Sequence, residues 1–444
     1  MIRVREAAER IVSKALEKGF EEAASRVVRY RSVMVKLANS EPSVIQRWDE
    51  VIVGAYLAKE RRALVVEARP SRLEEVDRIV EELAGFVSSV KESPLYAPLP
   101  EPVEVKPLST TCDDRILEAM KDPSELAQLV VNAAHEEGAE RIAGMISLKY
   151  WERAVATSTG ASLYEDQAMM ETYVRAFIDE GSGQWALGSR TLDKDSIEDV
   201  ARIAARYARE ARKPKPVEAG VYDLILSPMV VGNLMNLVAF MSSALRVMMG
   251  FSIFSQRAVG ENVASSIFTL LDDARNPQLP GSTAFDDEGM PTSSKPIIEE
   301  GVLRNLLHNS KTAHKMKART TGNAGWIMPH SWTLRVEAGD CSLDEMISEV
   351  KRGLLVTNNW YTRLQNYVEG IFSTITRDAL LVIEDGEVKG AATRLRIADK
   401  LPSLLANVDV VGKELYDIKW WEVRVPTRAP YLLIRGVHTS KHLD

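Results

Sequence analysis

The stretch "AFDDEGMPTSSK" (284–295) places three consecutive carboxylates, Asp286, Asp287 and Glu288, directly before a glycine. Such a cluster can hold a hard cation, transfer protons or form a turn. A twelve-residue calcium loop needs alternating oxygen ligands and a closing glutamate, and this stretch lacks both. Because glycine adopts positive φ without steric cost, Asp287-Glu288-Gly289 predicts a tight turn between strands.

The histidines do not show the spacing of a zinc site. "HEEGAE" (135–140) opens like a zincin motif, but its second histidine is missing, and the segment ends a predicted helix. His308 and His314 flank a short segment with neither zincin spacing nor a nearby cysteine. His438 and His442 lie in the C-terminal tail, where fraying is expected. The sequence therefore predicts no metal ligand and no catalytic residue in this chain.

Five polar residues in strand-rich or turn-rich text are candidates for contact with a peptide or a cavity. They are Thr321, Asn323, Tyr361, Arg363 and Arg377. The loop that contains Thr321 and Asn323 can direct backbone amides towards a ligand, or it can simply join two strands. Two arginines, Arg363 and Arg377, can hold a peptide's terminal carboxylate through paired hydrogen bonds, and internal salt bridges are the alternative.

Composition is that of a globular protein large enough for two or three domains. The chain has 444 residues, almost half of them apolar, and a formal net charge of −7. This acidic balance argues against direct contact with nucleic acid. The two cysteines, Cys112 and Cys341, are far apart in sequence and are typical of a reducing compartment. No secretory signal is visible at the N-terminus, so we expect a cytoplasmic protein.

The uncharged segment Leu224–Leu245 is long enough to span a bilayer, but its details favour a core helix. Ser227 and Pro228 resemble an N-cap followed by proline at the first helical position. They divide the segment into a short strand and a buried helix of about five turns. Asn233 and Asn236 also make the segment poorly suited to hydrocarbon, so no membrane contact is expected.

Hydrophobic periodicity predicts an α+β protein with two domains. Residues 1–215 form a domain of helices and antiparallel strands, with a possible pseudo-repeat of 1–92 and 114–212. A proline-rich connector at 93–108 separates the two copies. Residues 216–444 form a domain with an antiparallel sheet or barrel and a buried helix. Hairpin turns are predicted at Glu300-Gly301 and Asp385-Gly386.

Three blocks resemble, in order and spacing, the C-terminal signature of the TldD/PmbA family, also called TldD/TldE or modulator of DNA gyrase. These blocks are "GSTAFDDEGMPTSSKPIIEEGVL" (281–303), "TTGNAG" (320–325) and "TNNWYTRLQNYVEGIFSTITRDALLVIEDGEV" (357–388). The wording is most similar to archaeal members. The resemblance is strong over residues 220–440 and holds only in pattern over the first 210.

The resemblance implies a two-domain α+β protein whose C-terminal domain is a β-barrel-like antiparallel sheet with a buried helix. It also implies a dimer around an internal cavity. TldD-type members are zinc metallopeptidases that cleave unfolded peptides, and they carry HExxxH on a helix with a further cysteine ligand near the C-terminus. PmbA/TldE-type members lack these ligands and pair with a TldD-type partner.

This chain departs from the zinc-binding pattern at each of these positions. The helix that corresponds to the zinc helix reads "SPMVVGNLMNLVAFMSSALRV", and the HExxxH positions fall on Asn236, Leu237 and Met241, or within one or two residues of them. No register supplies a histidine or a glutamate. Trp420 and Trp421 stand near the place of the cysteine. The resemblance therefore points to a PmbA/TldE-like subunit.

We expect a non-catalytic subunit that binds no cofactor itself and helps a zinc-bearing TldD-type partner to process unfolded peptides. The partner is either that HExxxH subunit in a heterodimer or a second copy in a homodimer. Two alternatives stay open. One is a peptidase that is active through an unrecognised site, and the other is a homodimeric peptide-binding or scaffold protein.

Overall fold

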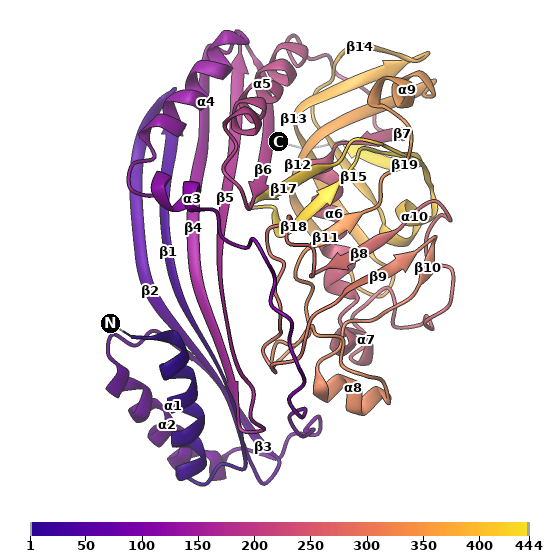
Figure 1. The fold of residues 1–444 in the computed structure, drawn as a ribbon. Helices are drawn as coiled ribbons and strands as arrows, with labels where there is room; N and C mark the ends of the chain where they lie inside the picture. The colour runs from indigo at the N-terminus through magenta and orange to yellow at the C-terminus, as the bar shows by residue number, and fades with distance from the viewer. Residues whose placement is uncertain (1, 442–444) are drawn as a thin grey trace.

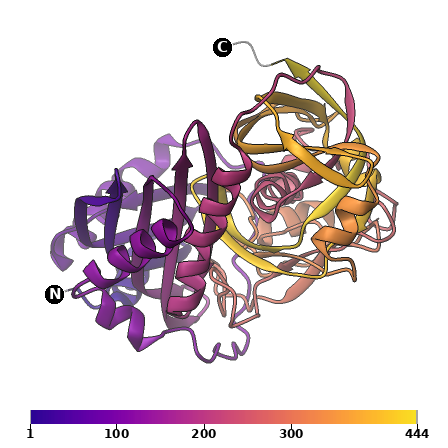
Figure 2. The same cartoon turned by 90° about the horizontal axis from the view of Figure 1, so that it is seen from above.

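The chain folds into two packed halves that together form an α+β structure (Figure 1). The computed structural model describes residues 2–441. In Figure 1 the first half, in indigo and magenta, is a sheet of long curved strands, and the second half, in orange and yellow, is a barrel with a second sheet. Figure 2 shows the two halves side by side from above, with helices on the outer face of the first sheet. The predicted fold class is confirmed.

The first half is built on one antiparallel sheet with the strand order β3-β2-β1-β4-β5-β6. Its strands are β1 (Glu22–Ala38), β2 (Glu41–Lys59), β3 (Arg62–Ala68), β4 (Arg141–Thr157), β5 (Ser162–Ile178) and β6 (Gly181–Ser189). Its helices are α1 (Val4–Glu17), α2 (Leu73–Phe86), α3 (Asp114–Ala119), α4 (Ser124–Glu136) and α5 (Lys194–Glu210), with a 3₁₀ turn at Val87–Ser89. The order helix, three strands, helix occurs twice, and the two sets meet where β1 pairs with β4. The division of the chain at 215/216 stays a prediction.

Helix α5 covers the sheet because its apolar residues recur every three or four positions. Ile197, Val200 and Ala204 are buried on that face. Contact with the sheet is close at Gly183, where an added Cβ would lie 2.2 Å from the carbonyl oxygen of Ala204. Glycine at this point of β6 therefore permits the direct approach of helix and strand.

The second half contains a closed five-stranded barrel. Its strands, in order around the barrel, are β12 (Arg352–Asn366), β7 (Val221–Leu226), β19 (Leu432–Lys441), β15 (Leu395–Lys400) and β13 (Ile371–Glu384). Closure follows because β12 pairs with both β7 and β13. The pairing of β7 with β12 is parallel, unlike the antiparallel sheet that the sequence predicts. A parallel pair requires a long crossover, and residues 227–351 form it.

A second sheet lies within that crossover and the C-terminal region, with the order β10-β9-β8-β11-β18-β17. Its strands are β8 (Leu270–Asp273), β9 (Ser294–Glu299), β10 (Val302–Leu303), β11 (Leu334–Val336), β17 (Tyr416–Trp420) and β18 (Val423–Ala429). The remaining elements are β14 (Glu387–Ala391), β16 (Val408–Val411), α6 (Pro228–Met241), α7 (Ala244–Met248), α8 (Ser310–Met316), α9 (Leu343–Ser348) and α10 (Leu401–Ala406). β17 also packs against β6 of the first half, which joins the two halves near the centre of the molecule.

The predicted core helix is α6, which begins at Pro228 and ends at Met241, about one turn earlier than expected. The helix ends there because the Ser242 hydroxyl donates to the carbonyl of Ala239. A separate short helix, α7, follows. Ser227 precedes Pro228 as predicted, but its hydroxyl donates to the carbonyl of Thr357 and does not cap the helix. Within residues 2–441, no helix combines the length and apolar character needed to cross a membrane.

Both predicted hairpin turns are confirmed. Positive φ angles occur in succession at Glu300-Gly301 (47° and 80°) and at Asp385-Gly386 (47° and 79°), as a type I′ turn requires. The tail differs from the prediction, because His438 lies within β19 and its Nδ1 is 3.0 Å from Asp399. His442 lies outside the described residues.

Candidate functional site

The acidic stretch forms the predicted tight turn. The Gly289 amide donates to the carbonyl of Asp286, and Gly289 has a φ of 77°. The turn is buried between the two halves of the molecule, and an added Cβ at Gly289 would lie 2.9 Å from the Cβ of Ala161 in the first half. Its three carboxylates are each at most 2% exposed.

Asp286 and Glu288 are held by hydrogen bonds within the second half. Asp286 accepts from the backbone amides of Glu288, Met290 and Ala324 at 2.9–3.0 Å. Glu288 accepts from the amide and the hydroxyl of Ser310 at 2.9 and 2.7 Å. These contacts make both side chains part of the loop framework.

Asp287 joins the two halves of the molecule. Its carboxylate accepts from Arg26 of β1 and Arg153 of β4, each at 2.7 Å. Its backbone carbonyl accepts from the indole of Trp326 at 2.9 Å. The acidic turn is therefore a docking element between the sheet and the second half, and its oxygens are already engaged.

The stability of the protein should depend on pH through Asp286. Burial raises the pKa of Asp286 to about 8, from an ordinary value of 3.8, and the neighbouring Glu288 contributes. Between these two values the folded protein retains a proton that the unfolded chain releases, so the unfolding free energy falls as pH rises and levels off above about pH 8. For one proton the slope is at most about 1.4 kcal/mol per pH unit.

Asparagine resembles the neutral acid in shape and cannot ionise. The variant D286N should therefore lack the fall in unfolding free energy that Asp286 causes as pH rises. The measurement is chemical denaturation of both proteins from pH 5 to 9, with the difference in unfolding free energy plotted against pH. The wild type should lose stability relative to D286N as pH rises. A difference that stays constant from pH 5 to 9 would mean that Asp286 is ionised in the folded protein.

A separate cleft of about 660 Å³ lies beside α6. Four segments surround it: α6, the loop residues 328–331, the β12 residues 360–363, and the β17–β18 turn with the start of β18, 421–425. This size is within the range of ligand pockets. The helix and the 420–422 turn, which the family resemblance associates with zinc ligands, therefore meet at one cleft.

One face of α6 lines the cleft. Asn233, Asn236, Leu237 and Phe240 all lie along it, at the three- and four-residue spacing of one helix face. Met241 is fully buried and packs in the core of the barrel. Of the three positions 236, 237 and 241, the structure thus brings two to the cleft. The third lies about 100° around the helix from Phe240 and about 140° from Asn236, towards the core of the barrel.

Asn236 ties the helix to β18. Its Nδ2 donates to the carbonyl of Val425 and the hydroxyl of Thr427, and its Oδ1 accepts from the Val425 amide at 2.7 Å. Asn236 can make all three bonds because an amide side chain both donates and accepts hydrogen bonds.

Asn233 has a similar position one turn earlier. Its Oδ1 accepts from Asn359 and Thr362, at 2.9 and 2.8 Å, and its Nδ2 donates to the carbonyl of Glu422. It therefore joins α6 to β12 and to the β17–β18 turn. Both asparagines are engaged in holding the walls of the cleft together.

The cleft residues do not fit a zinc ion. A catalytic zinc needs three protein ligands and an open position. The cleft offers one imidazole, His330, and one carboxylate, Glu422, beside two guanidinium groups, Arg363 and Arg424. Throughout residues 2–441, no group of three or more histidine, cysteine, aspartate or glutamate side chains is placed to hold a metal ion.

A β-bulge directs Tyr361 towards the cleft. The register of β12 against β13 shifts between Trp360 and Arg363, and Tyr361 has a φ of 56°. A non-glycine residue in this region costs of order 1–3 kcal/mol, and such bulges re-aim side chains near binding sites. The Tyr361 amide donates to Glu422 at 3.3 Å, and the Arg363 guanidinium lies 4.3 Å from the centre of the Tyr361 ring.

The other three candidate contacts are outside the cleft lining. Thr321 exchanges hydrogen bonds with the backbone of His308. Asn323 is fully buried and donates to Asp272 at 2.6 Å and to the carbonyl of His330. Arg377 lies over the ring of Trp360, 5.1 Å from its centre. These side chains support the loop and strand that form the cleft.

Several residues of the cleft were not among the candidates chosen from the sequence. They are His330, Trp421, Glu422 and Arg424, together with the loop residues beside His330. Trp421 is 68% exposed, whereas its neighbour Trp420 is buried. The run of two tryptophans and a glutamate at 420–422 is the sequence feature that could have indicated this wall. Burial lowers the pKa of His330.

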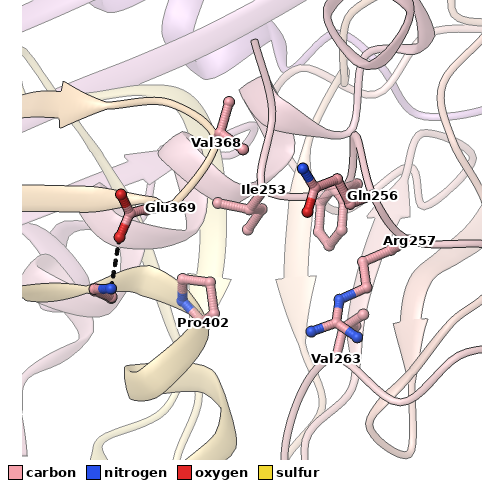
Figure 3. A pocket seen from close by; sticks show the side chains of 9 residues that line it. Ile253, Gln256, Arg257, Val263, Val368, Glu369 and Pro402 are labelled. Carbon is pink, nitrogen blue, oxygen red and sulfur yellow. Dashed lines mark hydrogen bonds and ion pairs between the residues drawn. The ribbon is translucent and has the colours of Figure 1, made fainter. Parts of the chain in front are cut away.

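A second hollow, of about 400 Å³, lies at the rim of the barrel (Figure 3). Its charged groups are mutually paired, since Glu369 accepts from Lys400 at 2.7 Å and Arg257 lies 3.4 Å from Glu261. Figure 3 shows Arg257 across the hollow from Glu369 and Pro402. Because its charges are already paired, this hollow is the weaker candidate for a ligand.

Comparison with known proteins gives a consistent family match. The PmbA/TldA metallopeptidase central domain matches residues 106–212, and the C-terminal domain of the same name matches residues 219–441. A metalloprotease of Methanocaldococcus jannaschii is 30% identical over 228 residues, which cover 50% of each chain. The matched region thus spans about half the length of that relative.

Two further comparisons cover more of the chain. A metalloprotease of Methanothermobacter thermautotrophicus is 24% identical over 337 residues, which are 70% of this chain and 73% of that protein. The crystal structure of TldE from Thermococcus kodakarensis has the same fold, with a TM-score of 0.87 and 22% identity over 98% of this chain and 100% of that one.

Proposed function

The chain belongs to the PmbA/TldD metallopeptidase family, and we propose that it is a non-catalytic subunit of a cytoplasmic zinc-dependent protease complex. In this proposal an HExxxH-bearing relative binds zinc and activates the attacking water. The present chain binds no zinc, completes the chamber and presents its cleft to an unfolded peptide.

The observation that supports the proposal is the composition of the α6 face that lines the cleft. This face presents Asn233, Asn236, Leu237 and Phe240, and both asparagines hold neighbouring strands. A zinc peptidase needs imidazoles and a carboxylate to bind the metal and to activate water. In this proposal the helix face holds neighbouring strands and offers apolar contact, and another chain carries out the cleavage.

A reconstitution experiment tests the proposal. The full chain and an HExxxH-bearing relative, encoded nearby in the same genome, are purified separately and mixed in equal amounts. The substrate is an unstructured, internally quenched peptide. We expect no cleavage by this chain alone, cleavage by the mixture, and zinc only in the relative. Replacing the HExxxH glutamate of the relative with glutamine should abolish cleavage by the mixture.

Each other result points to an alternative. Cleavage by the lone chain, insensitive to chelation, would establish an independent peptidase. Absence of association with any HExxxH relative, together with self-association, would establish a homodimeric binding or scaffold protein. Stoichiometric zinc in the lone chain would also overturn the proposal.

A further inference from the structure

We propose that the cleft beside α6 binds the free carboxyl terminus of a peptide whose last side chain is large and apolar. This inference deepens the proposed function, on which it depends only in taking a peptide as the ligand. It names the part of the peptide that is recognised and the residues that recognise it.

Two guanidinium groups in the cleft lack a carboxylate partner. Arg363 donates to the carbonyl of Thr362 and lies over the Tyr361 ring, and Arg424 is exposed at the start of β18. Among residues 2–441, neither lies within 4.0 Å of a carboxylate oxygen. The one carboxylate of the cleft, Glu422, accepts the Tyr361 amide. The cleft therefore carries an excess of positive charge that a carboxylate would complement.

Arginine is well suited to that role. Its planar guanidinium donates two parallel hydrogen bonds to a carboxylate, and it stacks on aromatic rings. The contact with Tyr361 orients Arg363 at the mouth of the cleft, because the bulge at Tyr361 sets the direction of both side chains. The structure thus pairs Arg363 with Arg424 as candidates for carboxylate binding, and not with Arg377.

The rest of the cleft is mainly apolar and aromatic. Its apolar walls come from α6, the 328–331 loop, β12 and the β17–β18 turn, and consist of Leu237, Phe240, Met328, Pro329, Trp360 and Trp421. Three of its rings are strongly exposed: Trp421 at 68%, Tyr361 at 50% and Phe240 at 38%. Exposed aromatic surface in a concave site is stabilised when a ligand covers it.

One terminal residue satisfies both features. In the last residue of a peptide the carboxylate and the side chain share one Cα atom, so a single residue can contact both an apolar wall and a guanidinium group of the same cleft. An internal segment has no charge to offer the arginines. An acidic side chain provides a carboxylate, but it places no large apolar group on the same residue. The geometry therefore favours a carboxyl terminus that ends in a residue such as phenylalanine or leucine.

The test measures peptide binding to the full chain alone, by fluorescence anisotropy. Three labelled peptides share one flexible sequence that ends in Leu-Phe: one has a free carboxyl terminus, one a terminal amide, and one a terminal amide with glutamate inserted two residues earlier. We expect the free acid to bind about 10- to 100-fold more tightly than either amide, as hydrogen bonds to charged groups imply.

Variants assign the preference to residues. The double variant R363Q/R424Q should bind acid and amide equally. The control R257Q, which removes an arginine from the hollow of Figure 3, should keep the full preference. W421A should weaken the binding of the free-acid peptide and of the amide peptide by the same factor, because it removes apolar contact and no charge.

Three outcomes would overturn the inference: equal binding of acid and amide, binding of the glutamate-containing amide as tightly as the acid, or a preference that survives in R363Q/R424Q. The reconstitution experiment is independent of these. Cleavage by the mixture without an acid preference would remove this inference and leave the subunit role. An acid preference without cleavage by the mixture would leave this inference in place and remove the subunit role.

Discussion

Replacing Arg153 with methionine should lower the free energy of unfolding by about 3–5 kcal/mol. Arg153 is buried, and its guanidinium donates to Asp287 at 2.7 Å, to Thr283 at 2.9 Å and to the carbonyl of Phe285 at 3.0 Å. Glu165 lies 3.2 Å away. Methionine fills part of the volume but leaves buried carboxylates without this cation. The loss in unfolding free energy is therefore larger than the net contribution of an ordinary salt bridge.

The matched control is R10M. Arg10 also forms a two-pronged pair, with Asp77, but both side chains are accessible to water. Exposed pairs contribute little because water replaces the lost contacts. Chemical denaturation of both variants gives the comparison. Equal losses in the two variants would contradict the assignment of the acidic turn as a buried polar link between the halves.

The second large effect should come from Asn323. N323D places a second carboxylate where Asn323 now donates to Asp272 at 2.6 Å, in a fully buried position. Asp272 already accepts from Lys295 and from the amide of Trp332. Two carboxylates at hydrogen-bond distance cannot both ionise, so the pair retains a proton or the structure opens. We expect a loss of about 3–5 kcal/mol, the range for an uncompensated buried charge, and a larger loss at higher pH.

A chemically identical change serves as its control. Asn366 also donates to a carboxylate, Glu369 at 3.1 Å, but in an exposed turn, so N366D should change stability far less. N323D should also weaken peptide binding, since Asn323 holds the carbonyl of His330 and thereby the loop at 328–331. An N323D variant that is as stable as N366D, or that binds the peptide as well as the wild type, would contradict this role of Asn323.

Local chemistry was enough to predict much of this protein. Alternating and helical periodicities indicate the α+β fold, and glycines after acidic residues indicate the turns at Gly289, Gly301 and Gly386. These features depend on a few neighbouring residues, through steric limits on φ and through hydrophobic spacing. The absence of histidine and glutamate from α6 is likewise a property of the sequence itself.

Other features depend on residues that are distant in sequence. The carboxylates of the acidic turn are buried because Arg26 and Arg153 of the first half reach Asp287. The orientation of α6, with Asn236 towards the cleft and Met241 towards the barrel, is set by its neighbours in space.

The sequence by itself therefore determined the elements, their turns and the absence of histidine and glutamate from α6, because each of these depends on local residue types. Only the tertiary structure decided which side chains share the cleft. It brought Arg363 and Arg424 together from separate strands and assigned Thr321 and Asn323 to structural roles. Such assignments depend on long-range packing and on which polar groups are desolvated together, and no local pattern encodes either of them.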